Sequence, residues 1–108
     1  MFERILPEMQ KAARAGLVYL TEHARDEMAD DSLTFQDVIN CILTGAIVER
    51  QYDVARDENK YVIYGDCMND DEMAVVAKLT YNNNVGVITV YRLRITDYDR
   101  RSKEQIES

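Results

Sequence analysis

The sequence has 108 residues, of which 13 are Lys or Arg, 20 are Asp or Glu and one is His, so its formal net charge is −7. Hydrophobic residues make up 46% of the chain and charged residues 31%, and the charges are interspersed, which excludes a disordered chain. The length favours one domain, because two cores of half this size would each be marginal, and no apolar run approaches the roughly 20 residues of a membrane span.

The N-terminal part of the chain has the periodicity of helices. Apolar residues recur every three or four positions between Phe2 and Ala13, which predicts a helix that begins just before Pro7 and stops at Gly16. A short apolar run over residues 17–20 then leads to Thr21, the expected N-cap of a second helix over residues 22–30. Because few residues of this second helix are apolar, we expect it to pack along one narrow edge.

The third predicted helix has the clearest local signals. Thr34 and Asp37 have the spacing of a capping box, in which each side chain accepts a backbone N–H of the other residue. Gly45 is expected to end the helix in the left-handed conformation. An apolar stripe joins these two ends and consists of Phe35, Val38, Ile39, Ile42 and Leu43.

After Gly45 the apolar period changes from about 3.6 to 2. Residues 46–52, 60–66, 73–81 and 85–93 are rich in strand-forming residues and are separated by polar turns. In the third run one face is wholly apolar or aromatic and should meet the helices; its members are Met73, Val75, Ala77, Leu79 and Tyr81.

The last two strands are expected to form a hairpin around Asn82–Asn84, because Asn tolerates positive φ. This loop places Tyr81 opposite Val85 and Leu79 opposite Val87. The outer face of the sheet then carries Lys78, Ile88, Val90 and Arg92. The fold class that follows is α+β, with two or three N-terminal helices on one face of a four-stranded antiparallel sheet. Residues 1–95 form this domain, and residues 96–108 form a charged tail.

Charge is unevenly distributed in the C-terminal part. Residues 78–96 hold Lys78, Arg92 and Arg94 and no acid. Two interpretations remain open: these are ordinary solvated cations of strands, or they form a small cationic patch that binds RNA locally on the open sheet face. The net charge of −7 opposes the long-range attraction of polyanions, which excludes a general nucleic-acid coat protein.

His23 is the only imidazole of the chain. It is a candidate general acid or base, or a half-exposed helix residue that pairs with the nearby Asp26 or Glu27. Cys41 and Cys67 are expected to be reduced thiols, and they form no C-x-x-C pair, so the sequence predicts neither a metal site nor a cofactor. Glycine-rich phosphate-binding and G-x-S-x-G motifs are not found in the sequence.

Several short motifs, taken in order, resemble one family. They are His23-Ala24-Arg25 with Met28, the capped helix ending at Gly45, the strand Ile47-Val48-Glu49, Tyr64-Gly65 and the terminal Ile88-Thr89-Val90-Tyr91-Arg92. This set, over about residues 19–93, resembles a small bacterial family of unknown function that is similar to the RelE/ParE-type toxin fold. In that fold, helices cover one sheet face, and the other face forms an RNA-cleaving or partner-binding groove.

The resemblance implies a cytoplasmic, toxin-like domain, and in particular a metal-independent endoribonuclease of a toxin–antitoxin system with an antitoxin-like protein partner. By the same resemblance His23 would be the acid or base, and Arg25 and Arg92 would hold the phosphate. Thr89 and Tyr91 would position the substrate, which Lys78 and Arg94 would also contact. The alternative is a non-catalytic protein-binding module on the same scaffold, favoured by the acidic surface and by Glu27, which stands where relatives commonly carry a base.

Overall fold

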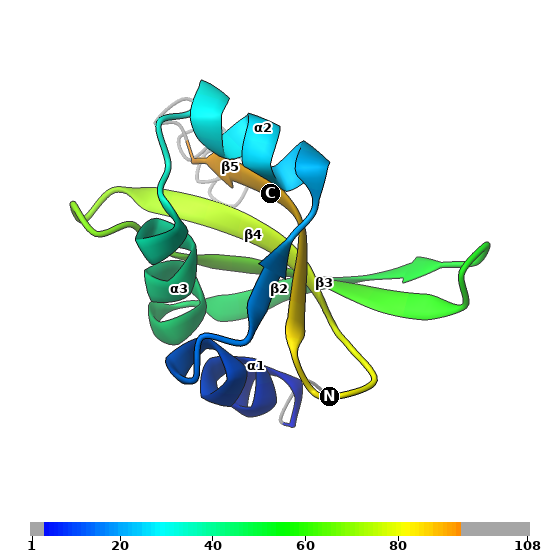
Figure 1. Ribbon diagram of the computed structural model, residues 1–108. Helices are drawn as coiled ribbons and strands as arrows, with labels where there is room; N and C mark the ends of the chain where they lie inside the picture. The colour runs from blue at the N-terminus through cyan, green and yellow to red at the C-terminus, as the bar shows by residue number, and fades with distance from the viewer. Residues whose placement is uncertain (1–3, 94–108) are drawn as a thin grey trace, which may run out of the picture.

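The computed structural model describes residues 4–93, which form three helices and five strands (Figure 1). In chain order the elements are α1 (Ile5–Arg14), β1 (Val18–Leu20), α2 (Glu22–Asp30), α3 (Phe35–Thr44), β2 (Ala46–Asp53), β3 (Glu58–Asp66), β4 (Glu72–Leu79) and β5 (Val85–Arg92). The predicted α+β class with N-terminal helices is confirmed. The tail predicted for residues 96–108 lies outside the described residues.

The sheet is mixed and has five strands in the order β1-β5-β4-β3-β2. The four predicted antiparallel strands are confirmed as β2 to β5, but the prediction lacks the parallel strand β1. β1 pairs in parallel with β5, with Val18 opposite Val85, while the other neighbours are antiparallel. Residues 17–20 look like a mere linker in the sequence because they are few. Their hydrogen-bond partners lie at the far end of the chain, and no local pattern indicates such pairing.

The ends of the helices follow the predicted caps, with one exception. Thr21 accepts the Ala24 N–H at the start of α2, and Thr34 and Asp37 form the complete capping box of α3. Gly16, with φ of +75°, follows α1 as expected. Gly45 is extended rather than left-handed, so that prediction is wrong. Glycine is needed there for space: a Cβ would lie 2.5 Å from the carbonyl oxygens of Cys41 and Tyr64.

The core lies between the helices and one sheet face, and Met73, Val75 and Ala77 of β4 are fully buried in it, as predicted. Tyr81 is instead fully exposed. The strand ends earlier than expected because Leu79, not Tyr81, pairs with Val85. Residues 80–84 therefore form the turn, closed by a hydrogen bond from the Thr80 N–H to the Asn84 carbonyl (2.8 Å).

A bulge in β5 changes which side chains reach the open face of the sheet. Ala77 pairs with Val87 and Val76 pairs with Thr89, so Ile88 is an additional residue on β5. Beyond the bulge Val90 is fully buried in the core, and Arg92 stands opposite the core residue Met73. The prediction that Val90 and Arg92 lie on the outer face is therefore wrong, and the bulge is the reason.

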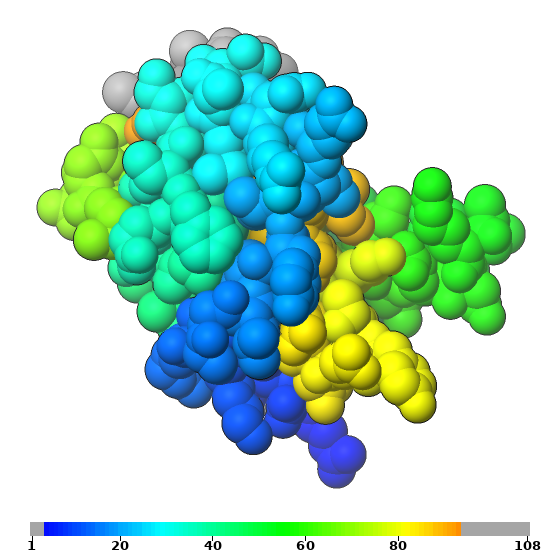
Figure 2. All heavy atoms as spheres, in the orientation of Figure 1, coloured from blue at the N-terminus to red at the C-terminus, as the bar shows by residue number. Residues whose placement is uncertain are grey.

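The hairpin of β2 and β3 extends away from the body of the molecule, and Figures 1 and 2 show it standing clear of the helices. β2 is an edge strand with mostly exposed side chains, and an irregularity in its pairing leaves Val48 without a direct partner on β3. α3 packs on β3 and β4, α1 packs beside α3 near β4 and β5, and α2 lies along β5 (Figure 1). Among the described residues, no helix is long and apolar enough to cross a membrane.

Candidate functional site

α2 lies against β5, and the contacts begin at Thr21, the N-cap of the helix. Thr21 has two functions, because its hydroxyl caps α2 and also donates to the Ile88 carbonyl (3.1 Å). The Thr21 N–H donates to the Val87 carbonyl (3.0 Å), so the start of α2 continues the pairing that β1 begins. Ala24 and Met28 are the buried residues of this helix, which confirms that it packs along a narrow edge.

Acidic side chains of α2 then take the place of a neighbouring strand. The Val90 N–H donates to Glu27 Oε1 (3.2 Å), and the Arg92 N–H donates to Asp31 Oδ2 (2.9 Å). Since β1 reaches only as far as Val87, these carboxylates satisfy N–H groups that would otherwise form an open sheet edge. This role was not predicted, although the four-residue spacing of Glu27 and Asp31 places both on one helix face.

His23 is the third member of this helix face. Its Nε2 lies 3.2 Å from Glu27 Oε1, and its side chain is 66% exposed. Glu27 therefore connects the imidazole to the backbone of β5 between the predicted site residues Thr89 and Tyr91. Chemically, this is an accessible imidazole with a fixed carboxylate partner, an arrangement that can exchange protons with a bound molecule.

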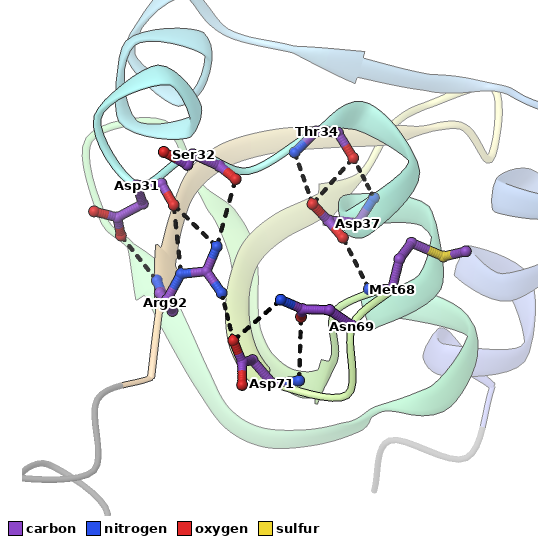
Figure 3. Close-up of polar contacts among 8 residues, drawn as sticks. All are labelled: Asp31, Ser32, Thr34, Asp37, Met68, Asn69, Asp71 and Arg92. Carbon is purple, nitrogen blue, oxygen red and sulfur yellow. Dashed lines mark hydrogen bonds and ion pairs between the residues drawn. The ribbon is translucent and has the colours of Figure 1, made fainter.

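Arg92 is engaged on the helix side of the sheet (Figure 3). Its guanidinium donates to Asp71 Oδ2 (3.0 Å), to the Asp31 carbonyl from Nε and Nη2 (3.4 and 3.1 Å), and to the Ser32 carbonyl (3.4 Å). These contacts join the C-terminal end of α2, the end of β5 and the turn before β4. Arg92 therefore stabilises the fold, and its contacts lead away from the open face.

The turn between β3 and β4 is held by Asp37, the buried acid of the capping box (Figure 3). Asp37 Oδ1 accepts the Met68 N–H (2.8 Å), while Oδ2 accepts the Thr34 N–H (2.9 Å). Burial alone would raise the pKa of Asp37, but the hydrogen bonds from Met68 and Thr34, aided by the charge of Arg92, hold it below its usual value.

The open face of the sheet carries a groove of about 630 Å³. It crosses four strands and is lined by Val48, Glu49, Gln51, Lys60, Val62, Tyr64, Val76, Ile88, Thr89 and Tyr91. Thr89 and Tyr91 were predicted as site residues, and the bulge in β5 places Thr89 here together with Ile88. The remaining lining residues were not predicted, since most of them lie on β2 and β3, for which the sequence predicted no facing.

The cations of the open face are paired with carboxylates. Lys60 Nζ lies 3.1 Å from Asp53 Oδ2, and Lys78 Nζ lies 3.3 Å from Glu58 Oε2. Hydrogen bonds from Lys60 and Arg56 lower the pKa of Asp53 to about 2. Lys78 and Arg92 thus lie on opposite faces of the sheet. The cationic patch predicted from residues 78–96 is therefore not formed by its described members, and Arg94 lies outside the described residues.

The structure brings some of the predicted catalytic residues together and separates others. His23 is connected through Glu27 to the Val90 N–H, and Arg25 is exposed on the same helix, whereas Thr89 and Tyr91 line the groove of the open face. Arg92 is held at the other end of α2 by the carbonyls of Asp31 and Ser32, and among residues 4–93 no contact joins it to His23. These assignments of catalytic roles stay predictions.

Neither cysteine has the character of a reactive site. Cys41 is fully buried on α3, and its thiol donates weakly to the carbonyls of Ile63 and Met73. Burial raises the pKa of Cys41 to about 12 and also raises the pKa of Cys67, which disfavours the thiolate that ligates metals. Within residues 4–93 no group of three His, Cys, Asp or Glu side chains is arranged to hold a metal ion.

Comparison with known proteins gives one match. Residues 20–92 match a family described as a domain of unknown function (DUF4258), and this stretch runs from the end of β1 to the end of β5. Neither the curated proteins nor the solved structures give a match. Since the matched stretch exceeds half of the chain, the protein belongs to the DUF4258 family of domains of unknown function.

Proposed function

We propose that this protein is a protein-binding module whose open sheet face holds a partner protein. The observation that carries the proposal is the groove, which combines an apolar floor of Val62, Val76 and Ile88 with a polar rim that includes Gln51 and Thr89. An apolar centre inside a polar rim is the usual anatomy of a protein–protein interface. An antitoxin-like protein, implied by the resemblance to RelE/ParE-type toxins, is the partner class that we propose first.

The edge strand β2 adds a second element to this surface. β2 is paired on one side only, and Val48 and Tyr52 are 50% and 55% exposed. A partner segment that enters the groove passes this edge, where free backbone groups can accept an added strand. The ion pairs of Lys60 and Lys78 support a protein rather than RNA, because phosphate binding depends on available cations.

Photocrosslinking in the native host tests this proposal. A photoreactive amino acid is placed at Gln51 on the groove rim, and in a matched variant at Asp30, which is exposed on α2. We expect the Gln51 variant to give a defined covalent adduct with one protein, identified by mass spectrometry, and the Asp30 variant to give none. The proposal fails if Gln51 yields no protein adduct, or if both variants capture the same proteins.

A metal-independent endoribonuclease is the second candidate, and the pairing of His23 with Glu27 favours it. The exposed imidazole would accept the proton of a ribose 2′-OH, and Arg25 on the same helix would stabilise the phosphate. Expression of the wild-type protein should then slow bacterial growth, and the protein itself should cleave RNA in the presence of EDTA. The His23→Ala, Arg25→Ala double variant should do neither. Equal growth and equal RNA integrity in the two strains would exclude this activity.

A further inference from the structure

We infer that the groove binds a cationic amphipathic segment, which places an apolar side chain on the floor of Val62, Val76 and Ile88 and a Lys or Arg against Glu49. This inference rests on the protein-binding function proposed above and names the chemistry of the partner.

The shape of the groove fits an elongated occupant. Its lining residues come from β2, β3, β4 and β5, so it extends across three strand spacings, or about 14 Å. That length corresponds to about nine residues of an α-helix or about four residues of an extended chain. The volume of about 630 Å³ lies within the range of pockets that enclose small ligands, so it accommodates several inserted side chains.

The floor of the groove selects for apolar groups. Val62 on β3 and Val76 on β4 are opposite each other in the register and are nearly buried, with 4% and 9% of their surfaces exposed. Ile88 follows the core residue Val87 on β5 and joins them as the third apolar side chain of this face. The occupant therefore needs at least one apolar side chain opposite these three residues.

One carboxylate on the rim of the groove is open to a cationic partner. Lys60 shares Asp53 with Arg56, and Lys78, nearby on the same face, pairs with Glu58, so these cations already have carboxylate partners. Glu49 on the rim is exposed, and the contact found for its carboxylate is a hydrogen bond from the neutral Gln51 amide (2.8 Å). The carboxylate of Glu49 can therefore pair with a cation of the occupant, and the chain as a whole carries −7, so an approaching cationic segment is attracted and an anionic one is repelled.

Two synthetic peptides of about twelve residues test this inference. Both have leucines at helical spacing, and the other positions are Lys in one peptide and Glu in the other. Each is titrated into methyl-labelled full-length protein at low salt and followed by NMR. We expect the Lys peptide to shift the methyl signals of Val62, Val76 and Ile88 and to bind at least ~10-fold more tightly than the Glu peptide.

Charge variants separate a local effect of Glu49 from the effect of total charge. Glu49→Gln and Asp30→Asn each remove one negative charge, the first at the groove and the second on exposed α2. We expect Glu49→Gln to weaken binding of the Lys peptide by ~3- to 10-fold and Asp30→Asn to weaken it less than ~2-fold. Thermal unfolding of both variants verifies that they are folded.

Each outcome decides the inference. Equal weakening by both variants, tighter binding of the Glu peptide, or shifts confined to methyl groups outside the groove would overturn the cationic partner. The protein-binding function has its own test, because a partner crosslinked at Gln51 remains evidence for binding at this face whichever peptide the groove prefers. If the crosslinked partner were identified and contained no basic amphipathic segment, the function would stand and the inference would fall.

Discussion

At the residue scale, Asp37 contributes more than its place in a capping box suggests. One oxygen of its carboxylate accepts the Thr34 N–H at the start of α3, and the other accepts the Met68 N–H in the turn before β4. The second contact joins parts of the chain that are far apart in sequence. A local cap thereby becomes a tertiary contact, and it depends on the negative charge of a buried group.

Replacement of Asp37 by Asn should therefore have a pH-dependent effect. Because the pKa of Asp37 is lowered in the folded protein, its contribution is present above the unfolded carboxyl value of about 3.9 and is lost as the pH falls through the folded value. At pH 7 the variant should be less stable than the wild type by about 1–2 kcal/mol. At pH 3 this gap should narrow.

Urea unfolding at the two pH values measures this gap. Asp26→Asn, on the exposed part of α2, serves as the control and should leave the midpoint unchanged at both pH values. A gap of the same size at pH 3 and pH 7 for the Asp37 variant would contradict the role of the ionised carboxylate.

At the scale of the element, α2 functions as a substitute for a strand. It buries only Ala24 and Met28, so little apolar surface holds it. Its attachment comes from the hydrogen bonds of Thr21, Glu27 and Asp31 to β5. The excess of acid in this helix, which is unremarkable as surface charge, is thus partly explained by the need for acceptors along a sheet edge.

Glu27→Ala should expose the Val90 N–H to water. We expect amide hydrogen exchange at Val90 to accelerate by about tenfold, corresponding to the loss of one hydrogen bond of about 1.4 kcal/mol. Asp26→Ala removes an acid from an exposed position of the same helix and should leave this rate unchanged. NMR exchange measurements on both variants make the comparison, and equal rates at Val90 would show that Glu27 does not protect this edge.

Elements defined by neighbouring residues could be predicted from the sequence, and elements defined by distant pairing could not. The bounds of α2 and the capping box of α3 follow from short motifs, and both are confirmed. The parallel pairing of β1 and the bulge at Ile88 depend on contacts between segments far apart in the chain. The bulge alone reversed the expected facing of Val90 and Arg92.

The close packing of α3 against β3 was likewise invisible in the sequence, and glycine makes it possible. A Cβ on Gly65 would overlap the backbone carbonyl of Cys41, whereas a Cβ on Gly86 would meet only side chains, those of Lys78 at 3.5 Å and Thr80 at 3.7 Å. We expect Gly65→Ala to lower the free energy of unfolding by about 3 kcal/mol or more, since backbone must move, and Gly86→Ala to change it by less than about 1 kcal/mol. Chemical denaturation of both variants tests this contrast, which similar losses in the two would contradict.

At the scale of the whole molecule, the body and the projecting hairpin are held by different kinds of contact. The body buries one continuous core between the helices and the sheet. The distal hairpin, residues 52–59, is held by polar contacts, including those of Asp53 with Arg56 and Lys60 and of Tyr52 with Asp57. Val54 near its tip is 80% exposed. The hairpin therefore adds little to the core.

Removal of the distal hairpin should consequently leave the body folded. Gln51 and Lys60 are opposite each other in the register, so an Asn-Gly turn in place of residues 52–59 closes the two strands without changing their pairing. We expect the melting temperature to fall by no more than about 5 °C, which for a domain of this size corresponds to about 1 kcal/mol. The methyl signals of the core residues Ile63 and Val75 should keep their positions in NMR spectra. A larger fall in melting temperature, or a loss of these signals, would mean that the hairpin stabilises the core and does not merely extend from it.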